Sequence, residues 1–442
     1  MESKKELNAL YKYDAKPKFG EILSLGLQHV VAAIVGIVTP GLMIAEATNL
    51  NEANTTLILQ TSLVFAGITT LIQLFPIFGR FGARLPVMMG ASFAYVPILL
   101  AIGAEFGIGA IFGAQLIGGL TVIFVGLTIK KIRFIFPPIV TGTVILSIGF
   151  SLFPVAVKYM AGGAGNEGYG SWQSWLVAII TFVIVFYLNN FGRGFLKLSS
   201  MLVGMIIGYI VSLFLGMVDF VPIANAGLVQ SILPLHFGLE FKAVPIATLV
   251  VMYLVDSVQT IGQFSATTFG AMDRQPTDKE ISGAIMGSGL ANFLGSLFGS
   301  VPCATFGQNV GLVVSTKAIN KYIFTFASGV LLVAGFLPKI AAILTTIPQS
   351  VIGGATISVF ATIAMTGLRT VANEGLTPKN TTVVGTSLAF GIGIALSEGS
   401  LAGFPAWVTT IFGNSEVILT AIIAVVLNLI LNKPKPEKSL QE

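Results

Sequence analysis

Long apolar runs separated by short polar segments fill almost the whole chain. Most runs are about 18 to 22 residues long, enough for a helix to cross a hydrocarbon core about 30 Å thick. We expect about fourteen membrane-spanning segments, over residues 22–45, 57–77, 84–101, 107–128, 136–157, 173–190, 198–218, 243–265, 281–300, 303–318, 321–337, 346–366, 381–397 and 416–432. A single run could be the buried core helix of a soluble protein, but so many in series indicate an all-α membrane protein.

The composition excludes a soluble globular protein. Only 10% of the 442 residues are charged and 54% are hydrophobic, whereas soluble domains carry about 25% charged residues. Cys303 is the single cysteine, so an intramolecular disulfide and a cysteine-based zinc site are excluded. The third and tenth spans are short and rich in Gly, Pro and Ser, so we expect these two helices to be broken.

The positive charges support the count of fourteen spans. With the N-terminus in the cytoplasm, all but three of the 24 lysines and arginines fall on the cytoplasmic side, as the positive-inside rule requires. The exceptions are Lys158, Lys242 and Lys339. Both termini are therefore expected in the cytoplasm, with the chain in the cytoplasmic membrane. The net charge of +5 comes from loop residues that meet anionic lipid, and it implies no nucleic-acid partner.

The two halves of the chain resemble each other. Residues 136–149 read FPPIVTGTVILSIG and residues 347–360 read IPQSVIGGATISVF, an offset of 211 residues. The third and tenth spans lie at nearly the same offset. Seven spans in each half is an odd number, so the halves would have opposite orientations, which is a feature of transporters. Chance similarity between apolar, Gly-rich segments is the alternative interpretation.

Polar side chains within the spans indicate where a site lies, because such groups usually face a cavity or a partner. Asp256 lies in the middle of the eighth span, and Gln259 and Gln263 follow it on the same helix face. A carboxylate at this depth must be protonated, paired or bound to a cation. His29 also has a structural interpretation, as a hydrogen-bond partner of a neighbouring helix, and Asn292 is interpreted as a contact between helices.

The tenth span also carries a specific motif. Its sequence GQNVGLVVSTK contains Gln308, Asn309, Gly311, Thr316 and Lys317. These residues fill every defined position of the signature of the nucleobase–ascorbate transporter family, which the chain resembles. LQHVVA in the first span, RLPVMMGASFA in the third and TIGQ in the eighth are also similar to that family, so the resemblance covers nearly the whole chain.

The resemblance implies a fold of two inverted repeats of seven helices, with short strand-like breaks in spans 3 and 10. Spans 1–4 and 8–11, residues 1–130 and 243–337, would form a core domain that holds the substrate. Spans 5–7 and 12–14, residues 131–242 and 338–432, would form a gate domain that moves against it. Residues 433–442 would be a cytoplasmic tail, and a homodimer is an expectation of the family.

The resemblance also implies the site residues. Gln259, Gln308, Phe93 and the backbone near Ala91 and Thr305 would line a nucleobase site. An amide offers a donor and an acceptor to the edge of a base, and an aromatic ring can stack on its face. The residues expected to shape the site or take part in coupling are Asp256, His29, Asn309 and Gln263. Asn309 would brace the two broken spans.

One departure from the family pattern affects coupling. Members usually carry Glu where this chain has Gln259, and Asp where it has Gln263. Because Gln cannot titrate, Asp256 is expected to have taken over the titratable role; a facilitator without coupling and a sodium-coupled carrier are the alternatives. No cofactor, catalytic residue or metal site is expected. Gln308 at the start of the motif favours an oxopurine such as xanthine or urate over uracil.

The leading hypothesis is a proton-coupled nucleobase importer, with two rivals. An anion carrier of the related sulfate or bicarbonate type would need a cationic group near the broken spans, and the sequence offers none before Lys317. A membrane-bound enzyme or receptor would need a catalytic constellation or a large domain outside the membrane. The chain has short loops and only two histidines, so it is not expected to be an enzyme.

Overall fold

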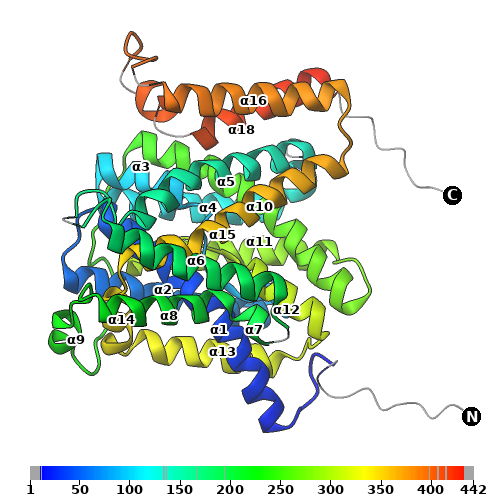
Figure 1. Ribbon diagram of the computed structural model, residues 1–442. Helices are drawn as coiled ribbons and strands as arrows, with labels where there is room; N and C mark the ends of the chain where they lie inside the picture. Colours follow the sequence, from blue (N-terminus) through cyan, green and yellow to red (C-terminus); the bar gives the residue numbers. More distant parts are fainter. Residues whose placement is uncertain are drawn as a thin grey trace, which may run out of the picture. The chain divides into compact units, whose positions relative to one another are not determined.

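The chain is helical over most of its length, as the apolar pattern predicts (Figure 1). The computed structural model describes residues 10, 12–132, 135, 137–166, 168–193, 195–397, 399–405, 408–413 and 416–432. The predicted tail, 433–442, lies outside the described residues.

The first half of the chain, up to the loop before the predicted eighth span, contains nine helices and one strand among the described residues. They are α1 (Phe19–Ala47), α2 (Glu52–Leu74), β1 (Met89–Ala91), α3 (Val96–Phe106), α4 (Ile108–Ile132), α5 (Pro138–Met160), α6 (Trp172–Phe191), α7 (Phe195–Leu198), α8 (Ser200–Phe214) and α9 (Val221–Asn225).

The second half begins with the longest helix of the described chain. Its elements are α10 (Ala243–Met272), α11 (Asp278–Phe298), β2 (Cys303–Thr305), α12 (Gly307–Thr316), α13 (Lys321–Gly335), α14 (Pro338–Thr345), α15 (Gln349–Asn373), α16 (Pro378–Leu396), the π-helix η3 (Thr409–Gly413) and α18 (Glu416–Leu431).

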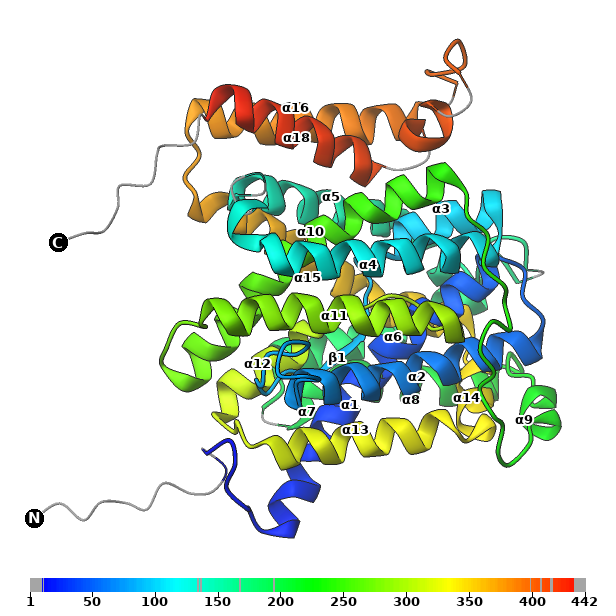
Figure 2. The ribbon, with the colours of Figure 1, turned by 180° about the vertical axis from the view of Figure 1, so that it is seen from behind.

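The chain forms two compact units. One comprises Met1–Leu127 and Phe153–Val359, and the other comprises Thr128–Leu152 and Phe360–Glu442. In the first unit α2 packs against α1, α11, α13 and α14, and these neighbours bury most of its surface (Figure 2). In the second unit α16 packs along α18. The predicted core and gate domains have different boundaries and stay a prediction.

Local sequence explains where several helices begin and end. Asn51 caps α2 by accepting a hydrogen bond from the Asn54 N–H at 2.9 Å. Thr277 and Glu280 form a reciprocal capping box at the start of α11. Pro338 starts α14, and the axis bends by 80° between α13 and α14. Proline fits the first turn of a new helix but cannot continue the old one.

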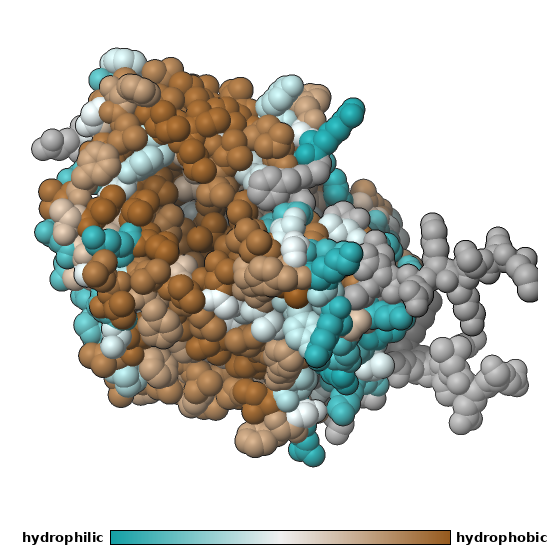
Figure 3. Space-filling view, turned by 90° about the horizontal axis from the view of Figure 1, so that it is seen from below, coloured by the Kyte–Doolittle hydropathy of each residue, from teal (hydrophilic) through white to brown (hydrophobic). Residues whose placement is uncertain are grey.

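The described residues include eight helices that are long and apolar enough to cross a membrane, or nine if the bent pair α13–α14 is one span. Every predicted span coincides with at least one helix, and the third and tenth coincide with a strand followed by a short helix. The number fourteen stays a prediction. Figure 3 shows a face on which hydrophobic residues predominate and hydrophilic residues gather toward one edge, as lipid contact requires.

Candidate functional site

The breaks expected in the third and tenth spans are two short strands that pair with each other. β1 and β2 are antiparallel, with Met89 opposite Thr305 and Ala91 opposite Cys303. The short helices α3 and α12 begin just beyond these strands. The first N–H groups of a helix have no partner within the helix and carry partial positive charge. The strand pair therefore brings polar backbone and two helix starts together inside the first unit.

Side chains from neighbouring helices hold this strand pair in place. Asn292 of α11 accepts a hydrogen bond from the Cys303 N–H and donates one to the Cys303 carbonyl, both at 2.8 Å. Thr70 of α2 accepts a hydrogen bond from the Met89 N–H at 3.0 Å. Asn292 was interpreted as a contact between helices; its amide instead completes the backbone hydrogen bonds of strand β2.

Two glycines leave space for the Phe306 ring, which lies in the turn after β2. A Cβ on Gly36 of α1 would lie 2.4 Å from the Phe306 ring, and a Cβ on Gly90 of β1 would lie 3.2 Å from it. Phe306 directly precedes α12 and is 5% exposed. The absence of side chains at the two glycines thus fixes the position at which α12 starts.

The polar face of α10 lies against these elements. α10 packs against α3, β2 and α12. Asp256 is 5% exposed, and the Oε1 atoms of Gln259 and Gln263 are buried without a hydrogen-bond partner among the described residues. A Cβ on Gly307, the first residue of α12, would lie 4.0 Å from the Gln263 Nε2. The predicted face of the eighth span therefore meets the start of α12.

Buried polar atoms without a partner gather on these four elements. Among the described residues, such atoms include the side-chain oxygens of Tyr95, Tyr253, Gln259, Gln263, Thr305 and Asn309. An unpaired buried polar group costs about 1–3 kcal/mol, and such groups in native proteins call for an explanation. A polar ligand that pairs with them is the explanation that the geometry favours.

Ala91 and Phe93 lie in or just after β1 and are 0% and 6% exposed. Gln308 is the second residue of α12, but its side chain is not among those that the structure describes. Ala91, Phe93, Thr305, Gln259 and Gln263 thus lie on or next to the paired strands and the helix packed against them. Their roles toward a ligand stay predictions.

His29 and Asn309 form a separate contact between α1 and α12. The Asn309 Nδ2 donates to the His29 carbonyl at 3.0 Å and lies 2.9 Å from the His29 Nδ1. An Nδ1 that accepts this bond has no proton, which makes His29 the neutral Nε2–H tautomer. The His29 ring packs on Phe324 of α13 at a centroid distance of 4.6 Å. Among the described residues, the side-chain hydrogen bonds of Asn309 go to α1, and the expected brace between the two broken spans stays a prediction.

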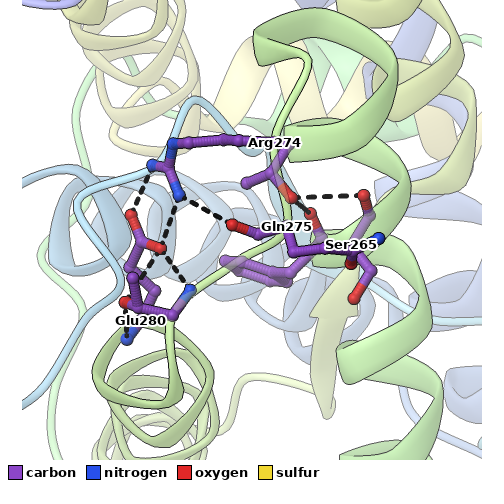
Figure 4. Close-up of polar contacts among 7 residues, drawn as sticks. Ser265, Arg274, Gln275 and Glu280 are labelled. Atoms are coloured by element: carbon purple, nitrogen blue, oxygen red, sulfur yellow. Dashed lines mark hydrogen bonds and ion pairs between the residues drawn. The ribbon is translucent and has the colours of Figure 1, made fainter. Parts of the chain in front are cut away.

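Loop charges near the helix ends are paired. Arg274 makes two hydrogen bonds to the Glu280 carboxylate, at 2.6 and 2.9 Å, and one to the Gln275 carbonyl (Figure 4). The hydrogen bond that Arg274 donates to Glu280 raises the pKa of Arg274. Lys317 follows α12 and contacts the Gly270 carbonyl at the end of α10. The last residue of the motif therefore lies at the far end of α12 from the strand pair.

The N-terminal segment is also paired to the first unit. Asp14 accepts hydrogen bonds from Arg84 at 2.9 Å and from Lys321 at 2.7 Å. The hydrogen bond from Lys321 is the main cause that holds the pKa of Asp14 below its ordinary value. Tyr13 donates to the Leu74 carbonyl at 2.8 Å. Residues 13 and 14 thus join the end of α2 to the start of α13.

Sequence reasoning missed Tyr95 and Tyr253 as site residues. Their rings pack at a centroid distance of 5.0 Å, and both side chains are almost completely buried. An aromatic residue in an apolar span is ordinary, so the only available signal was the position of Tyr253, three residues before Asp256 on the same helix face.

The comparison with protein families decides the class of protein. A model of the Permease family matches residues 20–399. The chain belongs to this family, the nucleobase–ascorbate transporters. It is 33% identical to the xanthine permease of Bacillus subtilis over 96% of this chain and 97% of that protein. It is also 33% identical to the uric acid permease PucJ of the same organism, over 97% of this chain and 96% of that protein.

Solved structures with low sequence identity share the fold. The transmembrane domain of the cyanobacterial bicarbonate transporter BicA has a TM-score of 0.61 at 17% identity, over 93% of this chain and 98% of that chain. The murine anion transporter Slc26a9 has a TM-score of 0.64 at 12% identity, over 95% of this chain and 69% of that chain. The family match and the permease relatives, and not this shared fold, make the protein a multi-pass membrane transporter.

Proposed function

We propose that this transporter carries a nucleobase across the cytoplasmic membrane, with an oxopurine such as xanthine or urate favoured over uracil. The observation that carries the proposal is the group of buried, unpartnered polar atoms on Tyr95, Tyr253, Gln259, Gln263, Thr305 and Asn309. A flat molecule with hydrogen-bonding edges can pair with several of them at once, whereas an apolar ligand would leave each one unsatisfied.

The chemistry of these atoms suits a base with several N–H groups. The unpartnered atoms of Gln259, Gln263 and Asn309 are carbonyl oxygens, which can only accept hydrogen bonds. Xanthine presents three ring N–H donors and two carbonyl acceptors, and uracil presents two of each. Relatives named as xanthine and uric acid permeases support the same choice.

The same observations disfavour an anion carrier. Among the described residues, no lysine or arginine forms an ion pair with Asp256, and Lys317 is held at the end of α10. A site rich in acceptor oxygens repels a small inorganic anion such as sulfate, which offers no N–H donors to those oxygens, unless a cation compensates. The likeness to BicA and Slc26a9 concerns the fold alone.

We further propose that transport occurs by alternating access of core against gate, each built from spans of two inverted repeats. The spacing of the helices supports the repeat: α3 and α12 begin at Val96 and Gly307, and α5 and α15 begin at Pro138 and Gln349, so both pairs are 211 residues apart. The antiparallel pairing of β1 with β2 fits two equivalent breaks of opposite direction.

Proton symport is the proposed coupling, with Asp256 as the titrating group. Asp256 is buried within α10, and a buried carboxyl without a cationic partner binds a proton or a cation, or accepts several hydrogen bonds. A facilitator is the second candidate, because Gln259 replaces the Glu that is usual in the family and cannot titrate.

Uptake into proteoliposomes tests both candidates. Radiolabelled xanthine, urate and uracil are offered with and without an inward proton gradient, to the wild type and to Asp256→Asn. Accumulation that needs the gradient and is lost in the variant supports the symporter. Equilibration without accumulation, unchanged in the variant, supports the facilitator. Absence of any base uptake contradicts the proposed function.

Gln308→Ala tests the predicted substrate residue of the signature motif. We expect loss of uptake or a changed order of preference among the three bases, with normal amounts of protein in the membrane. Thr316→Ala is a suitable control, since the Thr316 hydroxyl bonds to the Leu312 carbonyl of its own helix at 2.8 Å. Wild-type uptake and preference by Gln308→Ala would remove this residue from the site.

A further inference from the structure

Asp256 shares its surroundings with two tyrosines whose hydroxyl groups lie buried without a partner of normal hydrogen-bond geometry among the described residues. Tyr253 precedes it by three residues on α10, and Tyr95 comes from the segment between β1 and α3. The two rings pack at a centroid distance of 5.0 Å. The Tyr95 hydroxyl lies next to the Asp256 carboxyl, but neither phenol has a hydrogen bond of normal geometry among the described residues.

The burial of these phenols is imposed by the packing around them. Tyr95 is 0% and Tyr253 is 1% exposed. A Cβ on Gly118 of α4 would lie 2.2 Å from the Tyr253 ring, so α4 packs directly against this ring. Phenylalanine would fill the same space at no cost for an unpaired hydroxyl. The two hydroxyl groups are therefore unexplained by packing.

The chemistry of the three residues differs between the two states of the carboxyl. An ionised Asp256 can accept a strong, charge-assisted hydrogen bond from the Tyr95 hydroxyl beside it, and the Tyr253 ring packs against the Tyr95 ring and positions it. A protonated Asp256 has one O–H to donate and less capacity to accept. Binding a proton therefore forms an O–H bond on the carboxyl, removes its negative charge and weakens its hold on Tyr95. The proton comes from the water on one side and is returned to the water on the other.

We propose that Tyr95 and Tyr253 are positioning residues of the coupling site, which hold the ionised Asp256 carboxyl and pass its change of protonation to the start of α3. Tyr95 is suited to this because it lies four residues beyond the last residue of β1, in the broken third span. The inference rests on the proposed proton symport and extends it to residues outside the signature motif.

The other titratable groups near the carboxyl are few. On β2 the Cys303 thiol faces the same group, and its Sγ lies 3.7 Å from the Val301 carbonyl. Among the described residues, no Lys, Arg or His is paired with Asp256. The Tyr95 hydroxyl is thus a donor available to the ionised carboxyl.

Tyr95→Phe and Tyr253→Phe test the inference, because each removes one hydroxyl and keeps the ring. Xanthine accumulation in proteoliposomes is measured as a function of external pH, alongside xanthine counterflow without a gradient. Loss of a hydrogen bond of about 1.5 kcal/mol or more to the ionised carboxyl favours its protonated form. We expect the pH midpoint of accumulation to move upward by about one unit in Tyr95→Phe, and counterflow measures any separate loss of substrate binding.

Tyr209→Phe is the matched control. Tyr209 lies on α8 and its hydroxyl pairs with the Thr346 Oγ1 at 2.8 Å, away from α3, α10 and β2. The control is expected to keep the wild-type pH midpoint. A wild-type midpoint in both Tyr95→Phe and Tyr253→Phe would overturn the inference. Asp256→Asn distinguishes failure of this inference from failure of the proposed proton symport. If that variant still accumulates xanthine with the proton gradient, both the symport through Asp256 and the role of the tyrosines are wrong.

Discussion

The hydrogen bonds between Asn292 and Cys303 allow a quantitative prediction about the strand pair. Asn292→Leu keeps the approximate volume of the side chain and removes both of its hydrogen bonds to β2. The Cys303 N–H and carbonyl, each paired at 2.8 Å in the wild type, would then lie buried without these partners. We expect the variant to be less stable and to transport poorly, because β2 carries Thr305 to the site.

The expected loss of stability follows from the Cys303 N–H and carbonyl, which lose their hydrogen-bond partners. A buried backbone group that loses its partner costs about 1–3 kcal/mol, so the pair costs about 2–6 kcal/mol. Asn292 is 2% exposed, so water cannot readily replace the amide. In a chain of this size each kcal/mol lowers the melting temperature by about 1 °C. The apparent melting temperature should therefore fall by about 2–6 °C.

The assay is thermal unfolding of the purified protein in detergent, followed by the loss of the monodisperse peak in size-exclusion chromatography. Ser296→Ala is the control, since Ser296 lies one turn along α11, is equally buried, and bonds only to the Phe293 carbonyl of its own helix at 2.7 Å. It should change the melting temperature by less than about 2 °C. If Asn292→Leu melts like the control, the amide does not hold β2.

Two further predictions concern packing and charge. Gly36→Ala should lower xanthine uptake, because its Cβ would overlap the Phe306 ring at a cost of about 1–3 kcal/mol. Gly20→Ala on the same helix is the control, since no atom lies within 4 Å of its Cβ, and it should behave as wild type. Equal uptake by the two variants would contradict the predicted overlap. Asp14→Asn should expose the N-terminal segment to protease at pH 7. The hydrogen bond from Lys321 holds the pKa of Asp14 below 3.8. The stabilisation of the N-terminal segment by the ionised Asp14 is therefore present above that pH and is lost below it. If Asp14→Asn resists protease like the wild type at pH 7, Asp14 does not hold this segment.

The sequence predicts the broken spans well because their signals are local. Gly, Pro and Ser in the third and tenth spans weaken a continuous helix, and the structure has β1 and β2 there. The bend at Pro338 was missed, since the predicted span 321–337 ends where a second helix begins. A proline marks the end of one helix and suits the start of another, and local sequence does not separate these two outcomes.

Contacts between residues far apart in the sequence could not be predicted from local sequence patterns. Asn309 bonds to His29, which lies 280 residues away, and Tyr95 meets Tyr253 across two different spans. The motif identifies Asn309 as a residue of interest but does not contain its partner. A polar residue in a span could equally support the fold or bind a ligand, and only its hydrogen bonds in the structure separate the two roles.

The amide side chains of the first unit illustrate this separation. In Gln73 both ends of the amide are paired, with the Ala83 N–H at 3.1 Å and the Ala284 carbonyl at 2.9 Å. In Gln259 the buried Oε1 has no partner among the described residues. Replacing Gln73 removes hydrogen bonds that exist in the empty protein. Replacing Gln259 removes an acceptor whose burial already costs free energy there.

The two leucine variants should therefore have opposite effects on the empty transporter. Gln73→Leu should lower the melting temperature both with and without xanthine. Gln259→Leu should leave the melting temperature of the empty protein unchanged or raise it, because the unpaired acceptor is gone, and it should abolish the further rise that xanthine produces in the wild type. A lower melting temperature of empty Gln259→Leu would show that this amide supports the fold and would remove it from the substrate site.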